Sequence, residues 1–307
     1  TTLRHERAGG VPLSYRTAPM IDRHALWTGT AFAMAAGAMW GLVFVVPLLL
    51  PEYPAALLSS ARYAAFGLVA LPLAWLDRMR LRQLTRADWL DALKLSLVGN
   101  LLYYGCLAAA IQHAGAPLPT MIIGTLPVVL ALAANARRSD AVRAREGRLR
   151  WSRLAPSLAL IAAGIACVNH VELGHVLRDP AADVARYGTG VLFALGALAC
   201  WTWYPIRNAD WLRAHPGRSP NTWATAQGLA TLPLGLAGLA AFAAYLAWTS
   251  TGPQPASGVA ALLGPTPERF IALMLLLGFA SSWLGTLCWN ESSQRLPTAI
   301  AGQLIVF

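Results

Sequence analysis

Residues 28–41 read TGTAFAMAAGAMWG, and residues 189–202 read TGVLFALGALACWT. The two stretches align without a gap at a constant offset of 161 residues, so that Trp40 of the first corresponds to Trp201 of the second. Each stretch lies within an apolar window long enough to cross a bilayer. Duplicated membrane-spanning segments are typical of transporters that are built from two related halves. The fold is therefore expected to contain an internal repeat that spans a membrane.

Apolar windows recur along the whole 307-residue chain, of which 56% is hydrophobic and only 12% charged. The mean hydropathy is +0.49, more than a soluble domain needs. Continuous windows of roughly 20 residues predict membrane helices rather than barrel strands, which alternate and are shorter. They fall at 25–50, 54–76, 89–112, 115–135, 154–171, 188–206, 222–249 and 270–290, and a ninth begins near Leu296.

The positive charge is distributed unevenly between the two sides of these windows. If the N-terminus is cytoplasmic, 20 of the 24 Lys and Arg residues fall on the cytoplasmic side, and only Arg178, Arg186 and Arg269 fall outside, with Arg62 inside the membrane. An excess of basic residues on one side sets the orientation of a membrane protein. The net charge of +10 is therefore interpreted as a topology signal and not as a nucleic-acid surface.

The repeat and the topology together predict the fold class. Five crossings separate the two stretches, so Thr28 enters the membrane from the cytoplasm and Thr189 from outside. An odd number of helices per repeat inverts one half relative to the other. We expect an all-α polytopic membrane protein of ten transmembrane helices in two inverted five-helix repeats, with helix 10 absent from the chain as given. The expected parts are a cytoplasmic segment 1–24, a first repeat 25–171 and a truncated second repeat 188–307.

A weaker echo links the third and eighth windows. Gly99 follows Leu97-Val and precedes Pro117 by 18 residues, whereas Gly278 follows Leu276-Leu and precedes Pro297 by 19 residues. The two segments therefore align only if one residue of slippage is allowed.

Motifs in the same order resemble the drug/metabolite transporter superfamily, in its ten-helix EamA family. They are Met39-Trp40-Gly41, Ser59-Ser60-Ala61-Arg62-Tyr63, Cys106-Leu-Ala-Ala-Ala-Ile-Gln-His113 running into Pro117-x-Pro119-Thr120 and Leu126-Pro127, and Leu287-Cys-Trp289-Asn290-Glu-Ser-Ser-Gln294-x-x-Pro297-Thr298. The resemblance covers residues 25–307 and implies a transporter fold. Within the family, the chain is most similar to the YddG-type exporters of aromatic amino acids, through Tyr103-Tyr104-Gly-Cys106-Leu, Ala199-Cys-Trp201 and Trp289-Asn290. It departs from the wider family at Ala133-Ala-Asn135-Ala136, which lacks the acidic residue commonly found there.

Acidic residues are missing from the middle of every window; Asp91, Glu291 and Glu52 lie near window ends. Proton-coupled carriers usually load a carboxylate inside the bilayer. The sequence therefore favours facilitative export, although His113 or His170 could carry protons. No metal or cofactor is expected, because the cysteines lie in apolar windows and no motif of a membrane enzyme is present.

Two tryptophans are expected to mark the centre of the protein. Trp40 and Trp201 lie about 13–15 residues into their windows, roughly 20 Å along the helix. They could be packing residues, or they could line a pocket from opposite halves and offer flat apolar faces to a solute. Tyr103, Tyr104 and Trp283 add to the second interpretation.

Polar side chains at depth could bind the charged groups of a solute or join helices to one another. They are Asn100, Thr125, Asn169, Gln227, Ser281, Ser282, Asn290 and Gln303. From these and the aromatic residues, the predicted substrate-binding set is Trp40, Asn100, Tyr103, Tyr104, Thr125, Trp201, Ser282, Trp283, Asn290 and Gln303.

Arg62 lies roughly 12 Å below the outer end of its helix. It could attract an anion at a gate, or it could extend outward and pair with Glu52.

The predicted function is export of small metabolites, foremost neutral and aromatic amino acids, by alternating access around a central pocket. The alternative is a drug or other metabolite exporter of the same fold, with proton coupling an option. The expected partners are a small-molecule substrate and the lipid bilayer, with no nucleic acid. The expected location is the bacterial inner membrane, with a cytoplasmic N-terminus.

Overall fold

The computed structural model describes residues 23–136, 183–249 and 262–296, together with isolated residues between 155 and 174 and Leu304. Within these ranges the structure is all-helical, without strands, and six helices are long and apolar enough to cross a membrane. They correspond to six of the predicted windows, and a shorter apolar helix, Pro117–Leu130, falls in a seventh, at 115–135. The windows at 154–171 and after Leu296 lie outside the continuously described residues, as do residues 1–22 of the expected segment 1–24 and any tenth helix.

The described ranges contain thirteen elements. They are α1 (Arg23–Leu49), α2 (Ala55–Leu76), α3 (Arg78–Leu81), α4 (Arg86–Leu95), η1 (Ser96–Leu102), α5 (Tyr103–Ala114), α6 (Pro117–Gly124), α7 (Leu126–Ala136), α10 (Val184–Ala214), α11 (Pro220–Thr249), α13 (Pro267–Leu276), η2 (Leu277–Leu284) and α14 (Gly285–Arg295). Local signals explain several boundaries. A capping box between Thr85 and Asp88 begins α4. Gly115, at φ +75°, ends α5, and Pro117 begins α6.

Two of the membrane helices contain a π-helical segment, η1 between α4 and α5 and η2 between α13 and α14. A neighbouring helix comes very close to the glycine in each segment. A Cβ atom on Gly99 would lie 2.2 Å from the Tyr204 ring, and one on Gly278 would lie 2.8 Å from the Phe66 backbone nitrogen. Both positions therefore require glycine because only a residue without a side chain allows this approach.

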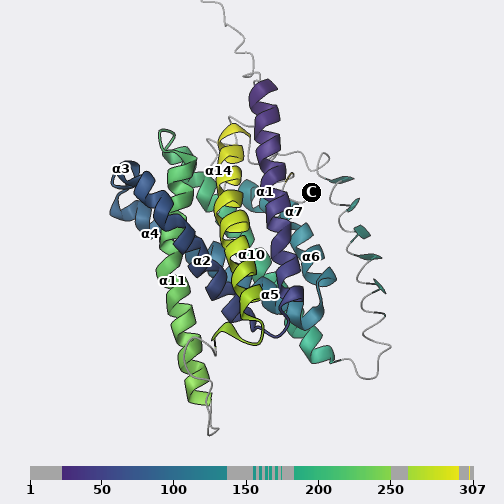
Figure 1. The fold of residues 1–307 in the computed structure, drawn as a ribbon. Helices are drawn as coiled ribbons and strands as arrows, with labels where there is room; N and C mark the ends of the chain where they lie inside the picture. Colours follow the sequence, from purple (N-terminus) through teal and green to yellow (C-terminus); the bar gives the residue numbers. More distant parts are fainter. Residues whose placement is uncertain are drawn as a thin grey trace, which may run out of the picture.

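Helices of the first part of the chain pair with helices of the second part, and the pairs are equivalent in the two directions (Figure 1). α1 packs along α14, and α10 packs along α5, while α2 and α11 pack along each other. α2 also contacts η2, and α11 contacts η1. The two copies of the repeated stretch lie on α1 and α10, which begin at opposite ends of the bundle in Figure 1. Their equivalent glycines, Gly29 and Gly190, both lie at close helix contacts, with Leu296 and Ala114 respectively.

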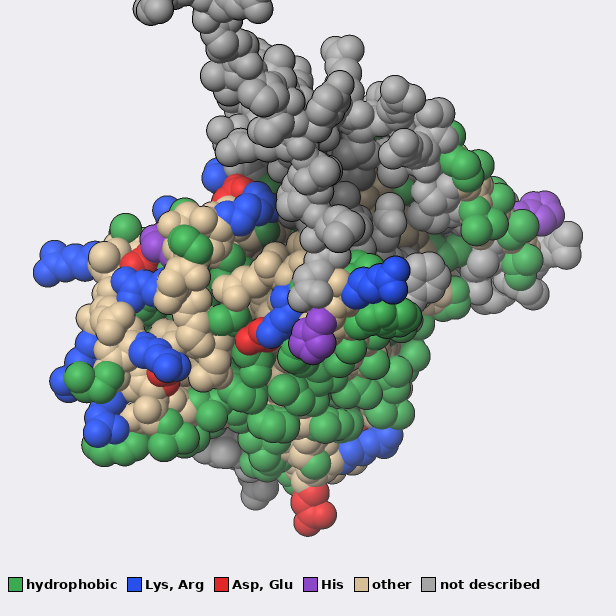
Figure 2. Space-filling model, turned by 90° about the horizontal axis from the view of Figure 1, so that it is seen from above, with side chains coloured by type: hydrophobic (Ala, Val, Ile, Leu, Met, Phe, Trp, Pro, Cys, Tyr) green, Lys and Arg blue, Asp and Glu red, His purple; other side chains and the backbone are tan. Residues whose placement is uncertain are grey.

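Basic side chains gather at one end of the bundle. The start of α1, the short helix α3 and the end of α14 lie together at the upper end in Figure 1, and Figure 2 looks onto that end, where many Lys and Arg side chains are visible. The helix α3 contains Arg78 and Arg80, and α14 ends with Arg295.

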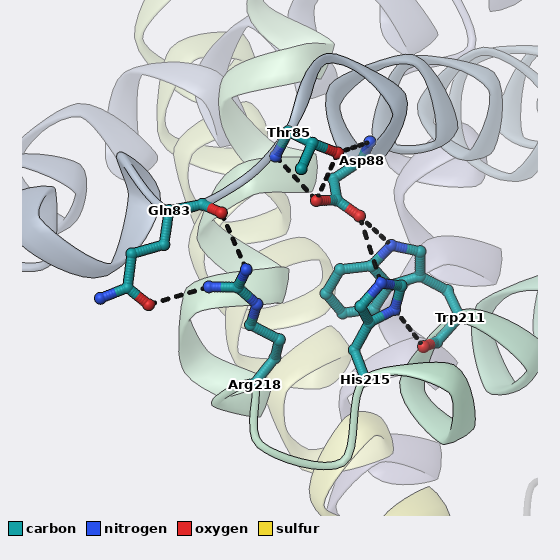
Figure 3. A network of polar contacts seen from close by, with 6 residues as sticks. All are labelled: Gln83, Thr85, Asp88, Trp211, His215 and Arg218. Carbon is teal, nitrogen blue, oxygen red and sulfur yellow. Dashed lines mark hydrogen bonds and ion pairs between the residues drawn. The ribbon is translucent and has the colours of Figure 1, made fainter.

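Polar contacts join the two parts of the chain at this same end (Figure 3). Asp88, which is 4% exposed, accepts a hydrogen bond from Trp211 Nε1 at 2.9 Å, and His215 Nε2 lies 3.6 Å from its carboxylate. Arg218 donates to the backbone oxygen of Gln83 at 2.8 Å and to its side-chain oxygen at 2.9 Å. These contacts hold the α3–α4 connection against the α10–α11 connection.

Candidate functional site

A cavity of about 260 Å³ lies in the middle of the bundle, with walls from both parts of the chain. α1, α2, η1, α5, α6 and α7 supply one side, and α10, η2 and α14 supply the other. Its lining residues are Gly37, Trp40, Gly41, Val43, Phe44, Arg62, Tyr63, Asn100, Tyr103, Thr120, Ile123, Gly124, Leu126, Trp201, Ser281, Ser282 and Thr286. The wall is mainly apolar and aromatic with a few polar groups, which is typical of small-molecule sites.

Of the predicted binding set and Arg62, six residues line this cavity. They are Trp40, Arg62, Asn100, Tyr103, Trp201 and Ser282. These six residues come from six separate elements and are up to 242 positions apart in the chain.

The other predicted binding residues lie elsewhere. Tyr104 is fully buried beneath Arg62, and Thr125 turns its hydroxyl back to the Ile122 carbonyl. Trp283 packs on Phe279, at 6.0 Å between ring centroids. Gln303 lies outside the described residues.

Asn290 belongs to a buried hydrogen-bond network beside the cavity. Its side-chain oxygen accepts from Asn208 at 2.9 Å, and the Asn208 oxygen accepts from Trp223 Nε1 at 2.8 Å and from Gln227 at 3.1 Å. Tyr204 donates in turn to Gln227 at 2.9 Å. The network joins α10, α11 and α14, so Asn290 connects helices here and does not face the cavity.

The aromatic residues at the centre contact one another. The Trp40 and Trp201 rings meet edge to face, with centroids 5.0 Å apart and planes at 85°. Tyr103 and Tyr204 both stack on Trp201, at 4.6 Å and 5.1 Å. Trp201 is only 7% exposed, so most of its indole surface is already covered. The expectation that both tryptophans present flat faces to a solute therefore fits the half-buried Trp40 better than Trp201.

The π-helical segments supply the polar part of the cavity wall. Asn100 lies in η1, and Ser281 and Ser282 lie in η2. A π-turn breaks the regular ladder of the helix, so its backbone groups can bond outside the helix. The Ser281 carbonyl accepts from Trp40 Nε1 at 2.8 Å, and the Ser281 hydroxyl donates to the Met39 carbonyl at 2.6 Å. These two bonds fix α1 against η2 and orient Trp40.

Arg62 turns inward, and the alternative pairing with Glu52 is not what the structure contains. Its Nε donates to the Ser282 hydroxyl at 3.1 Å, and its guanidinium lies 4.9 Å and 4.4 Å from the ring centroids of Tyr63 and Tyr104. Glu52 instead accepts a hydrogen bond from Thr266 at 3.0 Å. A buried cation thus lies in the wall of a mainly apolar cavity.

The sequence did not predict several lining residues. Gly41 and Gly124 leave open space where a Cβ atom would stand, so the missing side chains help to make the cavity. Tyr63 lines the cavity and directly follows Arg62, so the prediction for Arg62 could have included it. Asn208 of the buried network was missed because it lies beyond residue 206, the predicted end of its window. No group of three His, Cys, Asp or Glu side chains in the described segments could hold a metal ion.

These features define a polytopic α-helical membrane protein with a solute-sized cavity at its centre. A family model described as the EamA-like transporter family matches residues 27–139. The chain is also 53% identical over 280 residues to "Inner membrane protein YtfF" of Escherichia coli strain K12, a match that covers 91% of this chain and 84% of the relative. The chain belongs to the EamA-like transporter family of the drug/metabolite transporter superfamily. Membership in this family indicates a transporter and not an enzyme.

A solved structure, titled "Crystal structure of protein", shares the fold. Its TM-score is 0.56 at 15% sequence identity, over 91% of this chain and 84% of the other. At that identity the likeness concerns the fold alone.

Proposed function

We propose that this protein is an inner-membrane carrier that exports small metabolites, foremost neutral and aromatic amino acids, by alternating access around the central cavity. The observation that carries the proposal is a cavity with an aromatic wall and polar groups, built at the junction of the two parts of the chain. The relative named an inner membrane protein supports the location. The aromatic preference rests on the sequence resemblance to YddG-type exporters and on Trp40 and Tyr103 in the wall.

The architecture behind the proposal is two inverted five-helix repeats. Two observations support it: α1 with α14 is matched by α10 with α5, and η1 is matched by η2. Inverted repeats around one site give two related gates, which is the arrangement needed for alternating access. We further propose that transport is facilitative, because the described cavity wall contains no Asp or Glu.

Counterflow in liposomes tests this function. The purified protein is expected to exchange labelled phenylalanine or tryptophan without an imposed pH gradient. In cells, overexpression is expected to protect against toxic aromatic amino-acid analogues. Protection against quaternary cations alone would instead favour the drug-exporter alternative.

Filling the cavity is expected to exclude bulky solutes selectively. Gly124→Leu should place a side chain into the open space beside the cavity, so that tryptophan counterflow falls at least fivefold while alanine counterflow falls much less. Gly188→Leu is the matched control, because Gly188 also has open space beside it but does not line the cavity. Equal losses for both solutes in Gly124→Leu would contradict a size effect within the cavity.

Orientation can be tested at two exposed positions at opposite ends of the bundle. In a variant whose natural cysteines are replaced by serine, Arg82→Cys is expected to react with an impermeant maleimide only after the cytoplasmic side is opened. Glu268→Cys is expected to react in intact cells. This follows from the bias of basic residues toward the end that carries α3. Labelling of both positions from one side would overturn the proposed topology.

A further inference from the structure

We infer that Arg62 is the carboxylate-binding residue of the cavity, so that the solutes of this protein carry one anionic group attached to an apolar body. The inference rests on the proposed transport function and narrows its substrate class to monocarboxylates, zwitterionic amino acids included. It is carried by a buried guanidinium whose hydrogen-bonding capacity is only partly used.

The Arg62 side chain lines the cavity and is only 3% exposed. Its Nε donates to Ser282, but its Nη1 is buried and has no hydrogen-bond partner in the described part of the chain. An unsatisfied buried donor is costly, and more so when it carries charge. The guanidinium therefore keeps donor capacity that the described residues do not use.

The charge of Arg62 likewise has no counter-charge among the described residues. None of the ion pairs among the described residues involves Arg62. The Tyr63 and Tyr104 rings offer cation–π contacts to its guanidinium, which offset only part of the cost of removing a full charge from water. An anion in the cavity would supply the remaining compensation.

A carboxylate fits this site better than a phosphate. Arginine presents a planar fork that matches the two oxygens of a carboxylate. The lining residues include one cation, Arg62, and the rest of the wall is largely apolar, so a doubly charged group would remain half compensated. With the carboxylate on Arg62, the apolar body of the solute would lie toward Trp40 and Tyr103.

Arg62 also lies where the first part of the chain contacts the second part. Arg62 lies on α2, and Ser282, which holds its Nε, lies on η2. A carboxylate on Arg62 would therefore be held at the contact between these two elements.

The test compares solutes that share a phenyl body and carry the carboxylate, the ammonium group or both. Thermal shift of the purified wild-type protein in detergent is measured with phenylalanine, 3-phenylpropanoate and phenethylamine, and counterflow is measured with the same compounds. We expect phenylalanine and 3-phenylpropanoate to stabilise the wild type at concentrations at least tenfold lower than phenethylamine does. In Arg62→Gln this preference should disappear, and Arg62→Lys should retain part of it. Arg269→Gln, an exposed arginine outside the cavity, should behave as wild type.

The stability of the free protein separates a ligand anchor from a structural residue. If Arg62 is an anchor, ligand-free Arg62→Gln should melt at the wild-type temperature or above, because an unpaired buried charge has been removed. A large drop in melting temperature in both Arg62→Gln and Arg62→Lys would instead assign Arg62 to the structure and overturn the inference.

The two readouts also separate this inference from the proposed function. Carboxylate-dependent stabilisation that needs Arg62, without any counterflow, would uphold the binding site and remove the transport function. Counterflow of phenylalanine that is unchanged in Arg62→Gln would uphold transport and overturn the role of Arg62. An absence of stabilisation by every carboxylate in the panel would overturn it as well.

Discussion

Asn208→Leu is expected to destabilise the protein more than any other single polar substitution in its core. The Asn208 side chain is fully buried, donates to Asn290 and accepts from both Trp223 and Gln227. Leucine has a similar size but no polar atoms, so three buried groups on two other helices would lose their partner at once.

The size of the effect can be bracketed from two kinds of hydrogen bond. Bonds between membrane helices average about 0.6 kcal/mol, which gives roughly 2 kcal/mol for three. Stranding a buried group in a dry interior costs about 1–3 kcal/mol each, which sets the upper end near 9 kcal/mol. We therefore expect a fall in melting temperature of several degrees or more in detergent.

The control is Thr202→Val on the same helix. The Thr202 hydroxyl donates to the Leu198 carbonyl one turn earlier on the same helix. Its removal therefore leaves no polar group on another helix without a hydrogen-bond partner. A melting temperature for Asn208→Leu that equals that of Thr202→Val would show that the network contributes little to stability.

Trp201→Ala is expected to have the second large effect, and to act mainly through stability. Trp201 contacts Trp40 and carries the stacked rings of Tyr103 and Tyr204, and it is almost completely buried. Removing a buried tryptophan side chain costs about 3–5 kcal/mol. Counterflow of large and small solutes should fall together, in proportion to the loss of folded protein.

Two conservative variants separate packing from binding. Trp201→Phe keeps an aromatic ring between the two tyrosines and should recover most of the melting temperature. Trp40→Phe removes the bond to the Ser281 carbonyl and part of the exposed cavity wall, so it should reduce transport of aromatic solutes at nearly unchanged stability. A selective loss of aromatic transport in a stable Trp201→Ala protein would assign Trp201 to solute binding instead.

The membrane helices could be predicted because a bilayer forces each spanning segment to satisfy its own backbone. The windows therefore match the observed helices closely, as in 222–249 for α11 (Pro220–Thr249). The largest error is at the end of α10, which was predicted to stop near residue 206 and continues to Ala214. Its last turns contain Asn208 and Asp210 and lie against other parts of the protein through Trp211, so packing and not hydropathy sustains them.

The central cavity was harder to predict, because the depth of a residue in the membrane does not determine the direction in which its side chain points. Trp40 and Trp201 are at the expected depth and line the cavity, yet the mutual contact of their rings depends on helix rotation. Asn290 and Ser282 are eight residues apart in the chain, but one faces the network and the other faces the cavity. The intervening change from π- to α-helix alters which face each residue occupies, and no side-chain pattern in the sequence announces it.

The number of residues in each π-helical segment is consequently one of the determinants of the cavity wall. η1 has seven residues and η2 has eight, and the one-residue slippage between the echoes that begin at Gly99 and Gly278 spans these segments. Each residue of an α-helix turns the chain by about 100°. A single-codon deletion within residues 96–102 that restored α-helical winding would remove the extra residue that a π-turn holds, and so change which side chain of η1 faces the cavity, while the residues from Tyr103 on keep nearly their present orientation. Variation in coding length at these two places would reshape the site while leaving every lining side chain chemically intact.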